Sequence, residues 1–150
     1  MTEVDELLTI ERVAVLNRMV LFGAVPGHTL VAVARLLEEV RVEPGDTLIE
    51  GGSVEDWLFV VVDGRVRVHS GERTLAEAGP GSVVGELAVL VPAPRSASVT
   101  AIEPTLLLRL RRAPFEELLD DRPEIARAVI ATLARKLQES ADAGDILEGT

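Results

Sequence analysis

The sequence predicts a mainly β domain: an antiparallel β-roll of jelly-roll type (a double-stranded β-helix) with about eight strands, flanked by helices. Short β-branched and apolar runs, separated by glycine, proline and aspartate, fill the middle of the chain. Segments with apolar residues at helical spacing precede and follow them. We therefore expect one domain, with an N-terminal helical segment over 1–39, the β-roll over 40–110, C-terminal helices over 111–140 and a flexible tail over 141–150.

The N-terminal helical segment contains two stretches with a helical pattern. "VDELLTIERVAVLNRM" places apolar residues near helical spacing, with Asp5 as the expected N-cap. "VPGHTLVAVARLLEEV" repeats the pattern, and we expect its helix to continue as far as Val40. The glycines and prolines between the two stretches indicate a break.

The β-rich region shows its clearest turn in "WLFVVVDGRVRVH", where Asp63 and Gly64 separate a β-branched run from an alternating one. An Asp-Gly pair between two such runs is typical of a β-hairpin. "RVEPGDTLIE" indicates another turn between two short strands, at Pro44, Gly45 and Asp46.

Two helices are expected after the β-rich region. The first is short, in "APFEELL", and the second is long, in "DRPEIARAVIATLARKLQES". Asp121 and Glu124 have the spacing of a capping box at the start of the long helix. Its apolar stripe comprises Ile125, Val129, Ile130, Leu133 and Leu137, which covers more than one face.

Composition excludes several classes of function. The net charge of −10 argues against sequence-independent nucleic-acid binding, which needs a basic face. The chain has no cysteine, so it has no disulfide or thiolate metal site, and its two histidines, His28 and His69, are isolated. A signal peptide and a membrane segment are not evident, so we expect a cytoplasmic location. No nucleophile–base pair is evident either, so an enzyme is not expected.

Two opposite charges stand out in the otherwise apolar stretch "VVGELAVLVPAPRSASVTA". A short helix opening at Gly85 would present free backbone N–H groups to an anion, and Arg95 could bind a phosphate through two charge-assisted hydrogen bonds. Glu86 would suit such a site if it accepted a hydrogen bond from a sugar hydroxyl. The pair therefore fits an anionic group next to a ribose. The residues alone leave open a structural Glu86–Arg95 salt bridge, because most charge pairs are structural.

The segment "GELAVLVPAPRSASV" resembles the phosphate-binding cassette of the cyclic nucleotide-binding domain family, which includes the bacterial catabolite activator protein and the regulatory subunits of cyclic-AMP-dependent protein kinase. The family pattern is Gly-Glu-Leu-Ala followed by Arg-x-Ala-x-Val; we place the cassette at 84–98, and the last residue of the pattern follows it directly. The positions that match are Gly85, Glu86, Leu87, Ala88, Arg95, Ala97 and Val99. The strands before the cassette and the two helices after it, which would be the family's B and C helices, are also similar.

The resemblance implies a ligand and a role for each residue. Glu86 would accept from the ribose 2′-hydroxyl, and Arg95 would bind the cyclic phosphate. The backbone N–H groups of Leu87, Ala88 and Ala97 and the hydroxyl of Ser96 would complete the phosphate site, with Gly85 allowing close approach. The base would lie against Val68 and Leu75, with Ser140 of the long helix near it. We expect cyclic AMP as the ligand, with cyclic GMP less favoured, and no cofactor.

The resemblance also implies a regulatory module that signals through its last helix and can form a homodimer there. The activator protein's DNA-binding segment follows that helix, and no DNA binding is encoded in the present residues, so we expect a larger effector as fusion or partner. The alternative is a structural or protein-interaction module that keeps the fold without a ligand. A different anionic ligand is a third option, because a fold does not determine a function.

Overall fold

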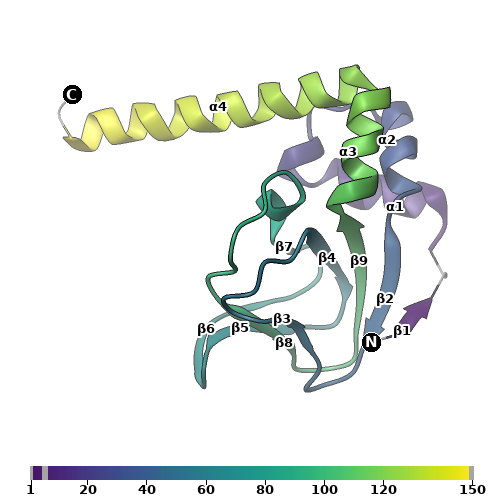
Figure 1. Cartoon of the computed structure of the whole chain (residues 1–150), viewed down its shortest axis with the longest axis vertical. Helices are drawn as coiled ribbons and strands as arrows, with labels where there is room; N and C mark the ends of the chain where they lie inside the picture. Colours follow the sequence, from purple (N-terminus) through teal and green to yellow (C-terminus); the bar gives the residue numbers. More distant parts are fainter. Residues whose placement is uncertain (1, 5–6, 149–150) are drawn as a thin grey trace.

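A computed structural model describes residues 2–4 and 7–148, with side chains from residue 7 to residue 143. Two antiparallel sheets form a roll, and the helices gather at one end of it, with α4 extending away from the roll (Figure 1). In chain order the elements are β1 (Thr2–Val4), α1 (Thr9–Asn17), the 3₁₀ turn η1 (Val20–Phe22), α2 (Gly27–Ala34), β2 (Glu38–Val42), β3 (Thr47–Ile49), β4 (Trp57–Asp63), β5 (Val66–Ser70), β6 (Arg73–Ala78), β7 (Val83–Val84), the 3₁₀ turn η2 (Glu86–Val89), β8 (Ser98–Ala101), β9 (Thr105–Arg111), α3 (Arg112–Asp121) and α4 (Pro123–Glu148).

The strand order confirms the predicted β-roll. One sheet has five strands in the order β1-β2-β9-β4-β7, and the other has four in the order β3-β8-β5-β6. The expected eight strands are β2 to β9, and β1 adds to the edge of the larger sheet. Within the described part of the chain, none of the helices combines the length and the apolar character needed to cross a membrane.

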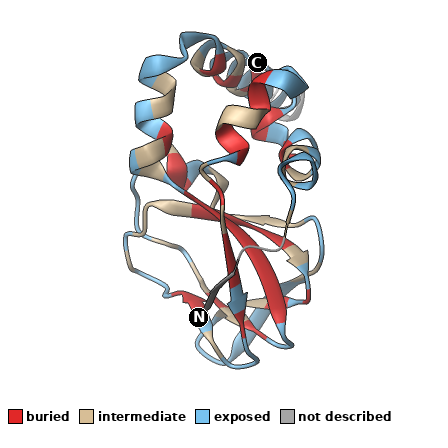
Figure 2. Cartoon of the chain, turned by 90° about the vertical axis from the view of Figure 1, so that its right-hand side faces the viewer, coloured by how far each residue is buried: buried red, intermediate tan, exposed pale blue. Residues whose placement is uncertain are grey.

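The larger sheet is buried on both faces, because the helices pack on one face and the other sheet packs on the other. Successive side chains of a strand point to opposite faces, so each strand contributes to both cores. On β4, Leu58 and Val60 pack among the helices, whereas Phe59 and Val61 point into the roll. Figure 2 shows these central strands as continuous buried segments, with the helices turning their buried faces toward them. The helical layer is therefore fixed to the sheet by a shared core.

The predicted β4–β5 hairpin is wrong. β4 pairs with β9 and β7, whereas β5 pairs with β8 and β6, so the chain passes from one sheet to the other at Asp63 and Gly64. Gly64 has φ +102°, and a Cβ there would collide with Thr105. The glycine is thus needed for a tight corner between the two sheets. The Asp-Gly sequence of such a corner is the same as that of a hairpin turn, so the two cannot be told apart from these residues alone.

The helical segments differ from the prediction at their ends. The described structure begins with a strand, Leu8 precedes α1 with its N–H bonded to Glu11 Oε1 at 3.0 Å, and the expected cap Asp5 lies outside the described residues. The second helix ends at Ala34, because the chain from Glu38 onward pairs with β9. Val40 and Val42 alternate into the core of the roll, which is a strand pattern that overrides the helical one.

Both C-terminal helices are present. Asp121 is the last residue of α3, and Arg122 stands directly before α4, where its carbonyl accepts from the N–H of Ile125 at 3.0 Å. The expected capping residue is therefore one position too early. The helix also continues through Glu148, so the chain beyond Ser140 is helical where a flexible tail was expected.

Candidate ligand-binding site

The stretch between β7 and β8 begins with a left-handed glycine. Gly85 has φ +75° and precedes η2, which carries Glu86 and Leu87. A Cβ on Gly85 would overlap the guanidinium of Arg95, with the Cζ atom 3.0 Å away. Glycine is therefore required here twice: for the backbone conformation, and to let the arginine lie against the main chain.

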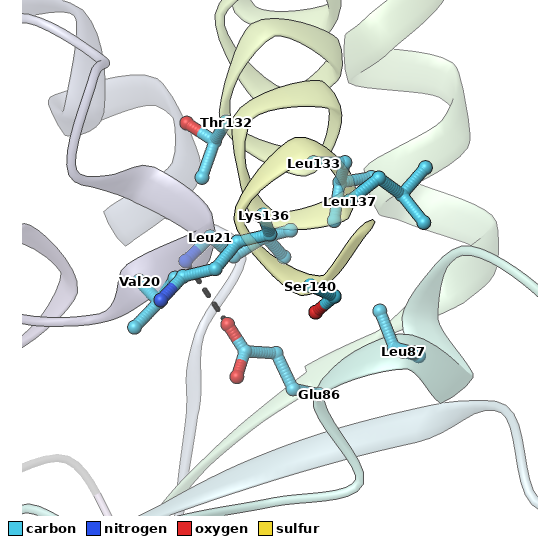
Figure 3. Close-up of a pocket in the computed structure, with 9 residues that line it drawn as sticks. All are labelled: Val20, Leu21, Glu86, Leu87, Thr132, Leu133, Lys136, Leu137 and Ser140. Carbon is cyan, nitrogen blue, oxygen red and sulfur yellow. Dashed lines mark hydrogen bonds between the residues drawn. The ribbon is translucent and has the colours of Figure 1, made fainter. Parts of the chain in front are cut away.

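The Glu86 carboxylate lies between η2 and the N-terminal helices. Its Oε1 accepts a hydrogen bond from the backbone N–H of Leu21 at 3.0 Å, across 65 residues of sequence (Figure 3). Leu21 belongs to η1 and is buried in the helical core. This bond holds the carboxylate through Oε1 and leaves Oε2 as an acceptor.

Arg95 is held by the loop before β4. Its Nη2 donates to the backbone carbonyl of Trp57. Its own N–H donates to Ser53 O at 2.8 Å, and its carbonyl accepts from Gly52 N–H at 2.8 Å. The Nε atom is buried and has no hydrogen-bond partner among the described residues. Partial burial lowers the pKa of Arg95 from its ordinary value, against the opposing effect of the Glu55 carboxylate, and the group stays charged at neutral pH.

Glu86 and Arg95 form no ion pair with each other among the described residues, since each is held by backbone groups of a different segment. The structural salt bridge that the spacing left open is therefore not what this structure contains. The two opposite charges lie at one site without pairing with each other, an arrangement that an external ligand with both a hydroxyl and an anionic group would complete.

Two adjoining cavities share Glu86, Leu87 and Leu133 in their walls. Their volumes are about 590 Å³ and about 670 Å³, within the roughly 300–1,000 Å³ of small-molecule sites. The first is lined by Val20, Leu21, Glu86, Leu87, Thr132, Leu133, Lys136, Leu137 and Ser140. The second is lined by Gly85, Glu86, Leu87, Ala88, Leu90, Val91, Ala93, Pro94, Arg95, Ser96 and Leu133. The first cavity thus has α4 as one wall, and the second is lined mainly by the cassette.

The structure brings most of the predicted phosphate residues together, because six of them line the second cavity: Gly85, Glu86, Leu87, Ala88, Arg95 and Ser96. Ala97 directly follows but does not line it. The N–H of Ala88, expected on the phosphate, here donates to Gly85 O at 3.0 Å. These roles stay predictions.

The three residues predicted around the base lie apart. Ser140 lines the first cavity together with Glu86. Val68 is half-buried against the core of the roll, and Leu75 lies 51% exposed on β6. Neither of them lines the two cavities, so their contact with a base stays a prediction.

Sequence reasoning missed Thr132 and Lys136, which line the first cavity. Together with Ser140 they have a spacing of four residues, so they share one face of α4. The spacing of these three polar residues is visible in the sequence. Our interpretation of this helix rested on its apolar stripe instead. Among the described residues, no group of three or more metal-ligating side chains is gathered where a metal ion could bind.

Comparison with known proteins decides the family. The profile described as "Cyclic nucleotide-binding domain" matches residues 39–122, which is more than half of the chain. This chain belongs to the cyclic nucleotide-binding domain family. The resemblance predicted from the cassette is therefore confirmed.

Relatives of this cyclic nucleotide-binding domain occur in several kinds of protein. It is 37% identical over 111 residues to the Pycsar effector protein XpPycTIR of Xanthomonas perforans, covering 73% of this chain and 36% of that protein. It is 40% identical over 101 residues to the Cyclic AMP receptor protein of Thermus thermophilus, covering 64% and 47%. The domain thus spans less than half the length of these two relatives.

A solved structure supports the fold. The N-terminal domain of a transcriptional regulator from Streptomyces coelicolor A3(2) superposes with a TM-score of 0.79 at 36% identity, over 86% of this chain and 94% of that one. This cyclic nucleotide-binding domain therefore has the same architecture as a domain that is joined to further segments in its own protein.

Proposed function

We propose that this domain is a regulatory sensor whose ligand is a cyclic purine mononucleotide, cyclic AMP or cyclic GMP, and whose output is carried by α4. The observation that carries the proposal is that Glu86 and Arg95 lie at one site without pairing with each other, while the Nε of Arg95 is buried without a partner among the described residues. A chain that kept the fold only for structure would gain from pairing these charges or replacing them, since an unsatisfied buried group is unfavourable.

In this proposal the cyclic phosphate lies at Arg95, where the buried Nε lacks a partner among the described residues. The ribose 2′-hydroxyl donates to Glu86, because Leu21 N–H occupies Oε1 and leaves Oε2 to accept. The base extends into the first cavity, where α4 provides Ser140. The acid and the base of the cassette thus bind different parts of one ligand, which explains why opposite charges occur together.

The output is proposed to travel through α4, because this helix forms one wall of the first cavity. A ligand filling the cavity favours the arrangement in which the helix is close to the roll. Ile130 of α4 is 64% exposed and lines neither cavity, which supports the predicted homodimer through this helix. The cytoplasmic location and the attachment to a larger effector stay predictions.

A thermal-shift measurement tests the binding proposal. A ligand that binds only the folded state at a hundredfold excess over Kd adds about 2.7 kcal/mol of stability. For a domain of this size, roughly 2–4 °C per kcal/mol translates this into a rise in Tm of roughly 5–10 °C. The matched control is the double variant Glu86→Gln/Arg95→Ala, which should show no rise. Absence of any shift with millimolar cyclic AMP or cyclic GMP would favour the purely structural module.

Amide hydrogen exchange tests the output. With ligand, we expect slower exchange both in residues 85–95 and in residues 122–140, because the helix is drawn onto the cavity. Exchange in α2 should not change, and this helix is the internal control since it does not line the cavities. Protection confined to 85–95 would show that α4 is a fixed lid and that the signal leaves by another route.

A further inference from the structure

The first cavity has walls suited to the flat face of a base. Its apolar side chains come from three segments: Val20 and Leu21 from η1, Leu87 from η2, and Leu133 and Leu137 from α4 (Figure 3). Apolar walls desolvate an aromatic ring without distinguishing one base from another. Discrimination must therefore come from the few polar groups that meet the edge of the base.

Those polar groups are Glu86, Thr132, Lys136 and Ser140. Glu86 accepts from Leu21 N–H and is assigned to the ribose in the proposed function. Thr132 Oγ1 donates to Ala128 O at 3.0 Å, so its proton is already engaged. The hydrogen-bond donors that remain for a base are the ammonium group of Lys136 and the hydroxyl of Ser140, one turn apart on α4.

The Lys136 ammonium group can exchange its present contact for one with a ligand. Its Nζ lies 3.9 Å from Glu139 Oε2, and the two side chains are 55% and 71% exposed. Exposed pairs of this kind contribute little to stability, so the contact with Glu139 is easily exchanged for one inside the cavity. The long apolar stem of the lysine can remain against the cavity wall while its end moves.

Lysine differs from serine in a way that decides the preference. An ammonium group donates three hydrogen bonds and accepts none, whereas a hydroxyl does both. Adenine and cytosine carry an exocyclic amino group, itself a donor, where guanine and uracil carry a carbonyl oxygen. Ser140 can therefore satisfy either kind of exocyclic group, but Lys136 can satisfy only the carbonyl and would have to turn to a ring nitrogen when an amino group stands there.

We infer that Lys136 makes this site prefer cyclic nucleotides whose base carries an exocyclic carbonyl at this position over those that carry an amino group. The inference rests on the proposed function, because it needs a cyclic nucleotide in the cavity. It places cyclic GMP ahead of cyclic AMP, which is the reverse of the order that the sequence predicts.

The test compares cyclic AMP with cyclic IMP by calorimetry on the full chain. The base of cyclic AMP carries an amino group at position 6, whereas the base of cyclic IMP carries a carbonyl there and a proton on the adjoining ring nitrogen. We expect cyclic IMP to bind the unmodified chain roughly tenfold more tightly. The variant Lys136→Met keeps the apolar stem and removes the donors, so its two affinities should become equal. Arg135→Met, the neighbouring exposed position outside both cavities, should keep the tenfold ratio.

The outcomes separate the two proposals. If neither cyclic AMP, cyclic GMP nor cyclic IMP binds, the proposed function fails and the preference fails with it. If cyclic AMP binds the unmodified chain as tightly as cyclic IMP, the preference is wrong while the proposed function stands. If Lys136→Met binds ligand and still prefers cyclic IMP, another group reads the base and the role of Lys136 is wrong.

Discussion

The two charges of the cassette are anchored to different layers of the molecule. Glu86 is bonded to Leu21 in the helical layer, whereas Arg95 is bonded to Trp57 and to the loop before β4 in the sheet layer. A ligand that contacts both therefore connects the layers through its own bonds. In the proposed function the ligand is thus a bridge between the two layers, and each prediction below changes one end of that bridge.

A second arginine beside Trp57 shows what a structural arginine looks like here. The guanidinium of Arg109 lies 4.6 Å from the centre of the Trp57 ring, and its Nε lies 3.1 Å from Glu38 Oε1. Burial raises the pKa of Glu38, but hydrogen bonds and charge from Arg109 and Arg111 outweigh it, so the net pKa is lowered. Arg109 thus has a carboxylate in place, whereas Arg95 has a backbone carbonyl and a buried Nε without a partner among the described residues. This difference supports assigning the anion to Arg95 in the proposed function.

The largest effect is expected from Arg95→Ala. Loss of a charge-assisted phosphate contact should weaken binding of cyclic GMP and cyclic AMP by about 2–4 kcal/mol. The fold should tolerate the change, because the hydrogen bond that the guanidinium loses is to a backbone carbonyl, and its interaction with the Glu55 carboxylate is only electrostatic. Calorimetry gives the affinity and thermal unfolding gives the stability. Arg65→Ala, which removes an exposed ion pair with Glu77, is the control and should bind normally. Equal binding by Arg95→Ala and Arg65→Ala would show that Arg95 does not bind the phosphate.

An intermediate effect is expected from Gly85→Ala, which pushes the arginine off the main chain. The added methyl group costs about 1–2 kcal/mol of stability through the left-handed backbone, and it displaces the guanidinium as well. Gly71→Ala is the matched control, since Gly71 also has positive φ (+57°) but a methyl group there would have no other atom within 4 Å. Both variants should lose stability, and only Gly85→Ala should lose affinity. A loss of affinity in both would mean that backbone strain alone is responsible.

The cassette could be predicted from the sequence because its chemistry is local. A left-handed glycine, an acid and an arginine within a dozen residues determine the turn and the two charges together. The continuous apolar, β-branched run of β4 likewise shows in its own residues. The partners of these elements are not local, which is why the Asp63–Gly64 corner was predicted as a hairpin. Strand pairing depends on the whole chain, and a glycine that turns a corner has the same local pattern as one in a hairpin.

The rest of the site was hidden for the same reason. Glu86 meets Leu21 from 65 residues away, and Lys136 reaches the cavity because α3 and α4 pack on the helical core. The polar row of α4 is present in the sequence, but only the packing shows that this side of the helix faces η2. The walls of the cavity are therefore a property of the assembled layers, and they could not be predicted from a motif.

The smallest effect is expected from Glu86→Gln, at the helical end of the bridge. The amide oxygen can still accept from Leu21 N–H, so stability should hardly change, but the ribose loses a charged acceptor. Binding of cyclic GMP should weaken by about 0.5–1.5 kcal/mol, while 2′-deoxy cyclic GMP, which lacks the hydroxyl, should lose much less. Glu77→Gln, an exposed change on β6, is the control and should alter neither affinity. Equal losses for the two ligands in Glu86→Gln would show that the carboxylate does not read the ribose, and that it serves only to hold η1 to the cassette.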